Sequence, residues 1–447
     1  MKKNNYYELT PSQDVIQLQT KYTLFKRVVN IIFSATVDEE FNKEVMTKAI
    51  NEVIKRNDCL RLRFEKHKGS LRQYIVDSHT INSIKSLSFN SKEEQQNWLL
   101  SYRKKTIKYL KGVVFEPLFI KTYDNKYMLL TKVCHLILDI YGINNLYKDI
   151  FNVYNALLEN TELPKPLESY EQVIIHDLNT KHNNEKMKKH YEFFKEQLQN
   201  KPEPYYVGIN GLEEPIIKKI HKKNKRAMKM FFINNDTEGY EHEIDKLTMD
   251  KVINFCEINK FSLANVMFYC CNLAASLIND KKECMLHLQL CNMRVSQKEK
   301  NTCGTKVQSV GTYTQFDFNK TFIDSVSEFC LNQLSLYKHI ALPDMNFEQL
   351  VHNVFPSSML ETYYSLTFSF IPYESNDNIR YELHSNGKGA LPCYLALLYD
   401  VNNGNVRMCY DCQTKIIKEH EVKNFHNKYV ELLNKVCENP NILLKSL

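Results

Sequence analysis

The sequence predicts an α/β fold made of two sandwiches of helices and strands. Helical and strand patterns are mixed in both halves of the chain, and a polar, charged stretch from about Pro164 to Pro204 separates them. With 447 residues, the chain is long enough for two domains of ordinary size. We therefore expect an N-terminal lobe over residues 1–175 and a C-terminal lobe over residues 176–447.

In the N-terminal half, the spacing of apolar residues predicts a helix over residues 38–58, with Asp38 as its cap. Alternating apolar residues predict a strand over 59–65, and a mostly apolar run predicts a buried strand over 126–138. Helical spacing returns from residue 143 to 160. These elements give the first lobe its mixed character.

The C-terminal half repeats this style. The uncharged segment from Phe261 to Ile278 approaches the length of a membrane span, but it holds polar residues and begins with Ser262 as a candidate cap, which favours a buried helix. Strands are expected over residues 284–294, 363–373 and 393–401, the last followed by a hairpin into 406–412. An amphipathic helix over 418–439 ends the pattern.

Composition excludes several function classes. The net charge of +7 is mild and does not indicate nucleic-acid binding. Thirteen cysteines include one C-x-x-C, Cys409 and Cys412, in a strand-like run without the second pair of a zinc site. An odd number of cysteines and an N-terminus without an apolar core predict reduced thiols and a cytoplasmic location.

The segment KVCHLILDIYG, Lys132 to Gly142, holds the main candidate for catalysis. His135 ends a predicted strand before a loop and a helix, a position from which a neutral imidazole can take a proton. Asp139 can orient the ring or anchor the loop through an arginine. The alternative is a core histidine hydrogen-bonded to backbone, and spacing alone favours that alternative.

Two further types of chemistry at this segment are disfavoured. Cys134 and His135 are adjacent in an extended strand, so their side chains point to opposite faces and cannot readily share a proton. A buried structural thiol is expected at Cys134. His135 and Asp139 have no further ligands at suitable spacing, so no metal is expected.

Read in order along the chain, several segments resemble the condensation domains of non-ribosomal peptide synthetases. These domains belong to the acyltransferase superfamily that includes chloramphenicol acetyltransferase and the carnitine acyltransferases. The segments are LTPSQ at 9–13, RNDCLRLRF at 56–64, CHLILDI at 134–140, VGTYTQF at 310–316, LPDMNFEQLV at 342–351, and the strand, helix and ENP ending over 410–440. Each motif is weak by itself, but together they cover essentially the whole chain.

This resemblance implies two chloramphenicol-acetyltransferase-like lobes in a V-shaped pseudo-dimer, with a tunnel between them that leads to the histidine. His135 matches the family's catalytic histidine, which deprotonates or positions the nucleophile that attacks an acyl thioester. Asp139 matches the motif aspartate, and Arg61 matches the arginine that pairs with it. The sequence departs from the motif at two positions, with Cys134 in place of the first histidine and Ile140 in place of the glycine.

The resemblance also marks tunnel and second-lobe candidates. These are Cys134, Ile140, Gly142, Asn292, Arg294, Gly311 and Gln315. Asn292 and Arg294 match an N-R pair near the tunnel, and Gly311 matches the latch region. The simpler interpretations are a surface cation at Arg294 and an ordinary turn at Gly311.

The implied function is acyl transfer from a phosphopantetheine or coenzyme A thioester to an amine or hydroxyl, as in natural-product biosynthesis. No bound cofactor is expected, and no attached module is visible in the sequence, so an acyl or peptidyl carrier protein or acyl-CoA would deliver the donor in trans.

The basic run from Lys218 to Arg226 would attract such an acidic carrier, or else is a solvated loop. The alternative, suggested by Cys134 and Ile140, is a degenerate module that binds or recruits a carrier protein or partner enzyme.

Overall fold

The computed structural model describes residues 5–21, 25–110, 112–211, 226–230, 235–358, 360–375 and 378–447. The chain forms two compact units. The first unit contains residues 1–183, 292–307 and 375–387, and the second contains 184–291, 308–374 and 388–447. The expected boundary at residue 175 falls inside helix α5 (Tyr170–Lys181). The V-shaped arrangement and the tunnel stay predictions.

A five-stranded sheet in the order β13-β1-β6-β5-β4 forms the centre of the first unit. Its strands are β1 (Asn30–Val37), β4 (Lys85–Ser88), β5 (Phe115–Lys121), β6 (Tyr127–Cys134) and β13 (Arg380–His384). Strand β1 pairs antiparallel with both β6 and β13, in the register Phe33 to Thr131 and Phe33 to Leu383. The second half of the sequence therefore supplies an edge strand to this sheet.

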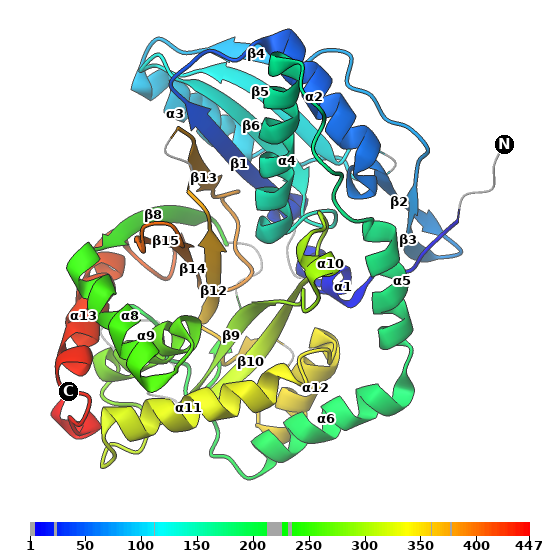
Figure 1. Ribbon diagram of the computed structural model, residues 1–447. Coiled ribbons are helices and arrows are strands. Elements are labelled where there is room, and N and C mark those ends of the chain that lie inside the picture. The colour runs from blue at the N-terminus through cyan, green and yellow to red at the C-terminus, as the bar shows by residue number, and fades with distance from the viewer. Residues whose placement is uncertain are drawn as a thin grey trace. The chain divides into compact units, whose positions relative to one another are not determined.

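Helices cover both faces of this sheet. Helices α2 (Lys43–Arg56) and α4 (Ile140–Glu159) lie side by side on one face (Figure 1). Helix α3 (Lys92–Arg103) covers the other face, where it packs on a smaller apolar cluster. The remaining elements of the first unit are α1 (Pro11–Lys21), the β2 (Leu62–His67) and β3 (Ser70–Ile75) hairpin, α5 and the short α10 (Gln297–Lys300).

The ends of two predicted elements differ from the sequence prediction. The helix expected from Asp38 begins later, because Asn42 is the residue whose side chain accepts a hydrogen bond from a first-turn amide, that of Val45 at 3.1 Å. The strand expected to reach residue 138 ends at Cys134. The residues after it turn towards α4, and this turn gives the chain its site loop, residues 135–139.

The second unit contains a six-stranded sheet in the order β10-β9-β12-β14-β15-β8. The strands are β8 (Thr237–Ile244), β9 (Cys284–Asn292), β10 (Val307–Gln315), β12 (Leu366–Tyr373), β14 (Cys393–Asp400) and β15 (Val406–Gln413). The helices are α6 (Asn184–Gln199), α8 (Lys246–Asn259), α9 (Leu263–Ile278), α11 (Phe322–Tyr337), α12 (Asp344–Val354) and α13 (Glu419–Glu438). Strands β7 (Met228–Lys229) and β11 (Glu361–Thr362) form a separate pair.

Helix α9 confirms the prediction of a buried helix between Phe261 and Ile278. Its residues from Asn265 to Ser276 are buried in the core of the second unit, where α8 and α13 pack against it. The Tyr429 hydroxyl of α13 donates to the Met267 carbonyl at 2.9 Å. Taken singly, none of the described helices has the length and apolar composition of a membrane span, although α8 and α9 together, bent by 116°, do.

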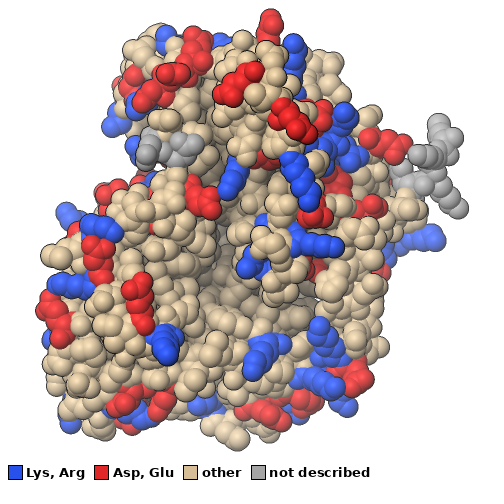
Figure 2. Space-filling view, in the orientation of Figure 1, with Lys and Arg blue, Asp and Glu red and all other residues tan. Residues whose placement is uncertain are grey.

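The cysteines agree with the expectation of reduced thiols. All thirteen cysteines are free of disulfides, and the Cys412 thiol donates a hydrogen bond to the Cys393 sulfur of the neighbouring strand at 3.5 Å. Figure 2 shows basic and acidic side chains interspersed over the face that it draws. The basic run from Lys218 lies outside the described residues except for Arg226.

Candidate active site

The backbone of the site loop is held at both of its ends by distant segments. The His135 amide donates to the Val29 carbonyl at 2.7 Å, and the Thr305 hydroxyl donates to the His135 carbonyl at 2.5 Å. Farther along the loop, the Asp139 amide donates to the Gly304 carbonyl at 3.3 Å. Because the strand β6 before the loop is buried almost throughout, the imidazole projects from a rigid base.

The His135 ring has a defined tautomer. Its Nδ1 lies 2.9 Å from the Leu138 carbonyl, which can only accept a hydrogen bond, so Nδ1 carries the proton. In the neutral ring, Nε2 is then left with the lone pair. Burial lowers the pKa of His135, and the nearby Asp139 carboxylate only partly offsets this effect. The imidazole is therefore neutral at pH 7 and able to take a proton at Nε2.

Asp139 is a structural residue. Its Oδ1 accepts from the Gly142 amide at 2.7 Å and caps helix α4, and its Oδ2 accepts from the Lys306 amide at 2.7 Å. Arg294 forms a two-pronged ion pair with the carboxylate, Nη1 to Oδ2 at 2.8 Å and Nη2 to Oδ1 at 3.1 Å. Burial alone would raise the pKa of Asp139, but Arg294 and the amide donors outweigh burial and hold it below its usual value.

Arg61 does not pair with Asp139, so this part of the resemblance is corrected. The Arg61 side chain donates to the backbone carbonyls of Val76 and Asp77 at 2.8 and 3.2 Å. Arg61 directly precedes β2, and Val76 and Asp77 follow β3 at the same open end of the hairpin, where the guanidinium binds; Arg294 takes the place beside the carboxylate. The simpler interpretation of Arg294 as a surface cation is wrong, since its side chain is 1% exposed.

The segment 292–307 completes the site loop within the first unit. The Asn292 side chain accepts hydrogen bonds from the amide and Nη1 of Arg294, both at 3.1 Å. Arg294 Nη2 also donates to the Gly304 carbonyl at 2.8 Å. A Cβ on Gly142 would lie 2.5 Å from the Gly304 oxygen, so only glycine permits the start of α4 to approach this closely.

Gln13 is a loop-holding residue to which sequence analysis assigned no role. Its Nε2 donates to the Leu136 carbonyl at 2.9 Å, and its amide group pairs with that of Gln73 at 2.7 Å. Gln13 is fully buried. It belongs to the LTPSQ segment, which was noted only as a motif, and nothing in the local pattern links residue 13 to residue 136.

Cys134 and Ile140, where the chain departs from the family motif, both pack into the first unit. Cys134 lies in the apolar core, and burial raises the pKa of its thiol to about 12, which makes it inert as a nucleophile. Ile140 is half-buried at the first turn of α4 and packs on the same core. Neither side chain makes a polar contact with the loop, although the Cys134 carbonyl accepts from the Ile137 amide at 2.9 Å.

One described cluster, formed by His176, Asp177 and Glu299, has the spacing of metal ligands. The Lys306 ammonium lies 2.6 Å from Asp177 and 2.9 Å from Glu299. A cation of the protein itself therefore already pairs with these carboxylates, and the cluster is an ion-pair network beside Asp139.

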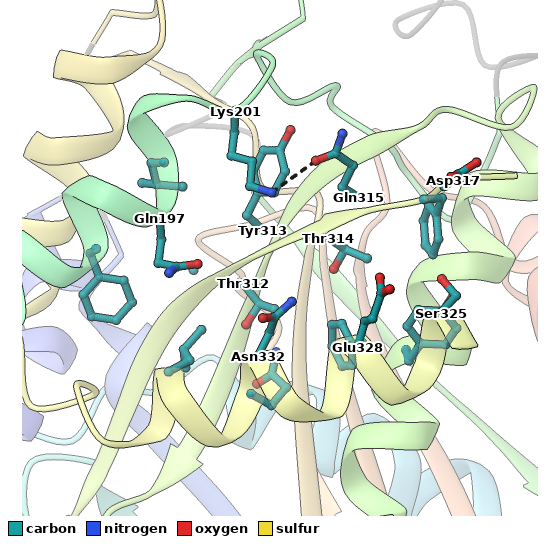
Figure 3. A pocket seen from close by; sticks show the side chains of 18 of the residues that line it. Gln197, Lys201, Thr312, Tyr313, Thr314, Gln315, Asp317, Ser325, Glu328 and Asn332 are labelled. Atoms are coloured by element: carbon teal, nitrogen blue, oxygen red, sulfur yellow. Dashed lines mark hydrogen bonds between the residues drawn. The ribbon is translucent and has the colours of Figure 1, made fainter. Parts of the chain in front are cut away.

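Gly311 and Gln315 belong to the second unit and line a pocket of about 360 Å³ there. Gly311 is not an ordinary turn. It lies within β10, where a Cβ would meet the Phe347 ring at 2.2 Å. Gln315 accepts a hydrogen bond from Lys201 at 3.3 Å (Figure 3). The described lining residues of this pocket include none of the residues that hold the site loop.

Comparisons with known proteins agree with the resemblance found in the sequence. A model of the condensation domain matches residues 3–447. Surfactin synthase subunit 1 of Bacillus subtilis (strain 168) is 21% identical over 463 residues, which are 99% of this chain but only 12% of that protein.

Solved structures agree in fold. The starter condensation domain of rhizomide synthetase RzmA in complex with C8-CoA has a TM-score of 0.81 at 15% identity, covering 99% of this chain and 97% of that one. The condensation domain of the monacolin K polyketide synthase MokA has a TM-score of 0.81 at 11% identity, covering 98% and 99%. The first condensation domain of the calcium-dependent antibiotic synthetase has a TM-score of 0.78 at 11% identity, covering 99% and 98%. By its family match and its fold, this chain belongs to the condensation-domain family.

Proposed function

We propose that this chain transfers an acyl group from a thioester to an amine or hydroxyl, with His135 as the general base. Nε2 of His135 takes the proton of the nucleophile as its nitrogen or oxygen attacks the thioester carbonyl. The carbon–sulfur bond then breaks, and the imidazolium returns the proton to the thiolate. The observation that carries the proposal is the Nδ1 hydrogen bond to Leu138, which leaves Nε2 as the basic atom in a family of acyl-transferring domains.

The donor is the phosphopantetheine thioester of a carrier protein or a coenzyme A thioester, and the acceptor is a small amine or alcohol. Relatives support this assignment, because the RzmA starter domain has been solved with C8-CoA and, in another variant, with C8-CoA and Leu-SNAC. The first unit, which carries the site loop, would supply the base.

The loop's departures from the family motif do not oppose catalysis. Cys134 is buried in the core, with its thiol protonated at neutral pH, so its side chain places no competing charge or nucleophile beside Nε2. The groups that set the ring's position, Leu138 and the Asp139–Arg294 pair, are all in place. A degenerate binding module would not need this tautomer to be fixed.

The test is a transfer assay with octanoyl-CoA and octanoyl carrier protein as donors and a panel of amines and alcohols as acceptors, read by mass spectrometry. Wild type should form amide or ester, and His135→Ala should be slower by about 100-fold or more. Cys134→Ala, which alters the neighbouring residue, is the matched control and should keep its activity. Equal rates for His135→Ala and wild type would refute the base, and carrier binding without any transfer by wild type would support the binding module instead.

A further inference from the structure

Lys306 is a buried lysine near the end of segment 292–307, and it contacts two helices of the first unit. Its side chain is 6% exposed, and its ammonium lies 2.6 Å from the Asp177 carboxylate of α5 and 2.9 Å from the Glu299 carboxylate of α10. Both carboxylates are themselves largely buried. Because a charge taken out of water is costly without its partners, the three side chains hold one another in place.

The backbone of Lys306 joins this cluster to the site loop. Its amide donates to Oδ2 of Asp139 at 2.7 Å, and its carbonyl accepts from the Met293 amide at 2.9 Å. The hydroxyl of the neighbouring Thr305 donates to the His135 carbonyl at 2.5 Å. The side chain of Lys306 therefore contacts α5 and α10, while its amide and its neighbour contact the loop that carries the imidazole.

The two carboxylates depend on the ammonium between them. Oε1 of Glu299 pairs with Lys306, and Oε2 accepts from the amides of Val295 and Ser296, both at 3.0 Å. Burial raises the pKa of Asp177, and the Lys306 ammonium limits that rise. Carboxylate oxygens of Asp177 and Glu299 lie within 4.8 Å of each other, so they would repel without the cation. Lys306 therefore holds α5 and α10 together at this point.

We propose that Lys306 is a positioning residue for His135. By joining α5 to α10, its ammonium fixes the backbone of residues 304–306 against the site loop, and this backbone sets the direction of the imidazole. Lys306 acts through the Thr305 hydroxyl and through its own amide, which binds Asp139. The effect on the rate rests on the proposed acyl transfer, whereas the effect on the ring does not.

The test compares Lys306→Met with Lys388→Met. Lys388 is the matched control, because its side chain is 2% exposed and forms an ion pair with Asp236 at 2.9 Å in the second unit. Histidine-selective ¹⁵N NMR of the full chain reads the His135 tautomer, and the signals are assigned by their absence in His135→Ala. Wild type and Lys388→Met should show one tautomer, protonated at Nδ1, and Lys306→Met should show a mixture of both.

A merely structural role would not produce this difference, because both lysine variants lose a buried ion pair and both should lose stability. In the transfer assay, Lys306→Met should lower kcat by about 10- to 100-fold and leave KM close to the wild-type value, since the ring moves and the substrate contacts do not change. Lys388→Met should keep the wild-type kcat.

Asp177→Asn keeps the shape of its side chain, removes one charge of the cluster, and keeps the test decisive if Lys306→Met does not fold. It should shift the tautomer ratio in the same direction by a smaller amount. The wild-type tautomer in every folded variant of the cluster, or an equal change in Lys388→Met, would overturn the proposal. If wild type transfers no acyl group, the proposed function fails, and the NMR comparison alone decides the role of Lys306.

Discussion

Replacement of Arg294 by methionine should cost the first unit much of its stability. The Asp139 and Arg294 side chains are 7% and 1% exposed, and the carboxylate accepts four hydrogen bonds. Arg294→Met removes the only side-chain donors among those four and leaves a charge buried with two backbone amides. Loss of one partner from a buried pair costs about 3–5 kcal/mol in the free energy of unfolding.

Urea unfolding of Arg294→Met, compared with Arg380→Met, measures this effect. Arg380 forms an ion pair with Glu382 at 3.1 Å but is 69% exposed, so its loss should cost about 0–1 kcal/mol. The double variant Asp139→Asn with Arg294→Met should lose less than the sum of the single losses, since no uncompensated charge remains. If Arg294→Met and Arg380→Met cost the same, the buried pair does not hold the loop and our account of it is wrong.

The pH dependence of this loss has a definite sign. In wild type the pKa of Asp139 is lowered, so its contribution to stability is present above the ordinary carboxyl pKa and is lost as pH falls below it. Without Arg294, burial raises the pKa of Asp139, and the carboxylate becomes a cost that protonation relieves. The deficit of Arg294→Met relative to wild type should therefore be larger at pH 7 than at pH 4, and a deficit that grows on acidification would contradict this reasoning.

Three other predictions follow from the site loop. The transfer rate should fall on acidification with an apparent pKa below 6.5, because burial lowers the pKa of His135 below the ordinary histidine value. If the rate falls with an apparent pKa above 6.5 instead, a group other than His135 is the base. Gly142→Ala should lower the free energy of unfolding by about 1–3 kcal/mol, as its Cβ would lie 2.5 Å from the Gly304 oxygen, and an unchanged thermal midpoint would show that the two segments separate freely. Gln13→Leu leaves the buried Leu136 carbonyl without its donor, so it should lower the free energy of unfolding by about 1–3 kcal/mol and slow acyl transfer. Transfer at the wild-type rate would show that His135 does not need this hydrogen bond.

The sequence predicted the type of most elements but not their ends. Apolar periodicity identified α2 and α13, which each bury one face, and a long uncharged run identified α9, which is buried almost throughout. The start of α2 was placed at Asp38 instead of Asn42, because both residue types cap helices and only the fold selects between them. Local pattern therefore predicts which element forms, and tertiary contacts decide where it begins.

The candidate site was predictable only in part for the same physical reason. His135 and Asp139 are close in sequence, so a motif could identify both. Arg294 lies 155 residues beyond Asp139, and no local rule distinguishes it from Arg61 as the carboxylate's partner. The pairing depends on the path of segment 292–307 into the first unit, which only the folded chain defines.

The orientation of His135 depends on the residues that hold the site loop, such as Asp139 and Arg294. It depends less on Cys134 and Ile140, where the chain departs from the family motif. The base that we propose needs a ring held in one orientation, and Leu138, Thr305 and the Asp139–Arg294 pair hold the ring and its loop. Cys134 and Ile140 contribute apolar packing to the core below the loop. A substitution of Cys134 or Ile140 that conserves side-chain volume leaves the hydrogen bonds of the His135 ring intact. A substitution of Arg294 leaves the motif from residue 134 to 140 unchanged in sequence, but it removes the ion pair that holds Asp139. The Asp139–Arg294 pair, and not the first histidine of the motif, is therefore the better structural criterion for an intact loop in this chain.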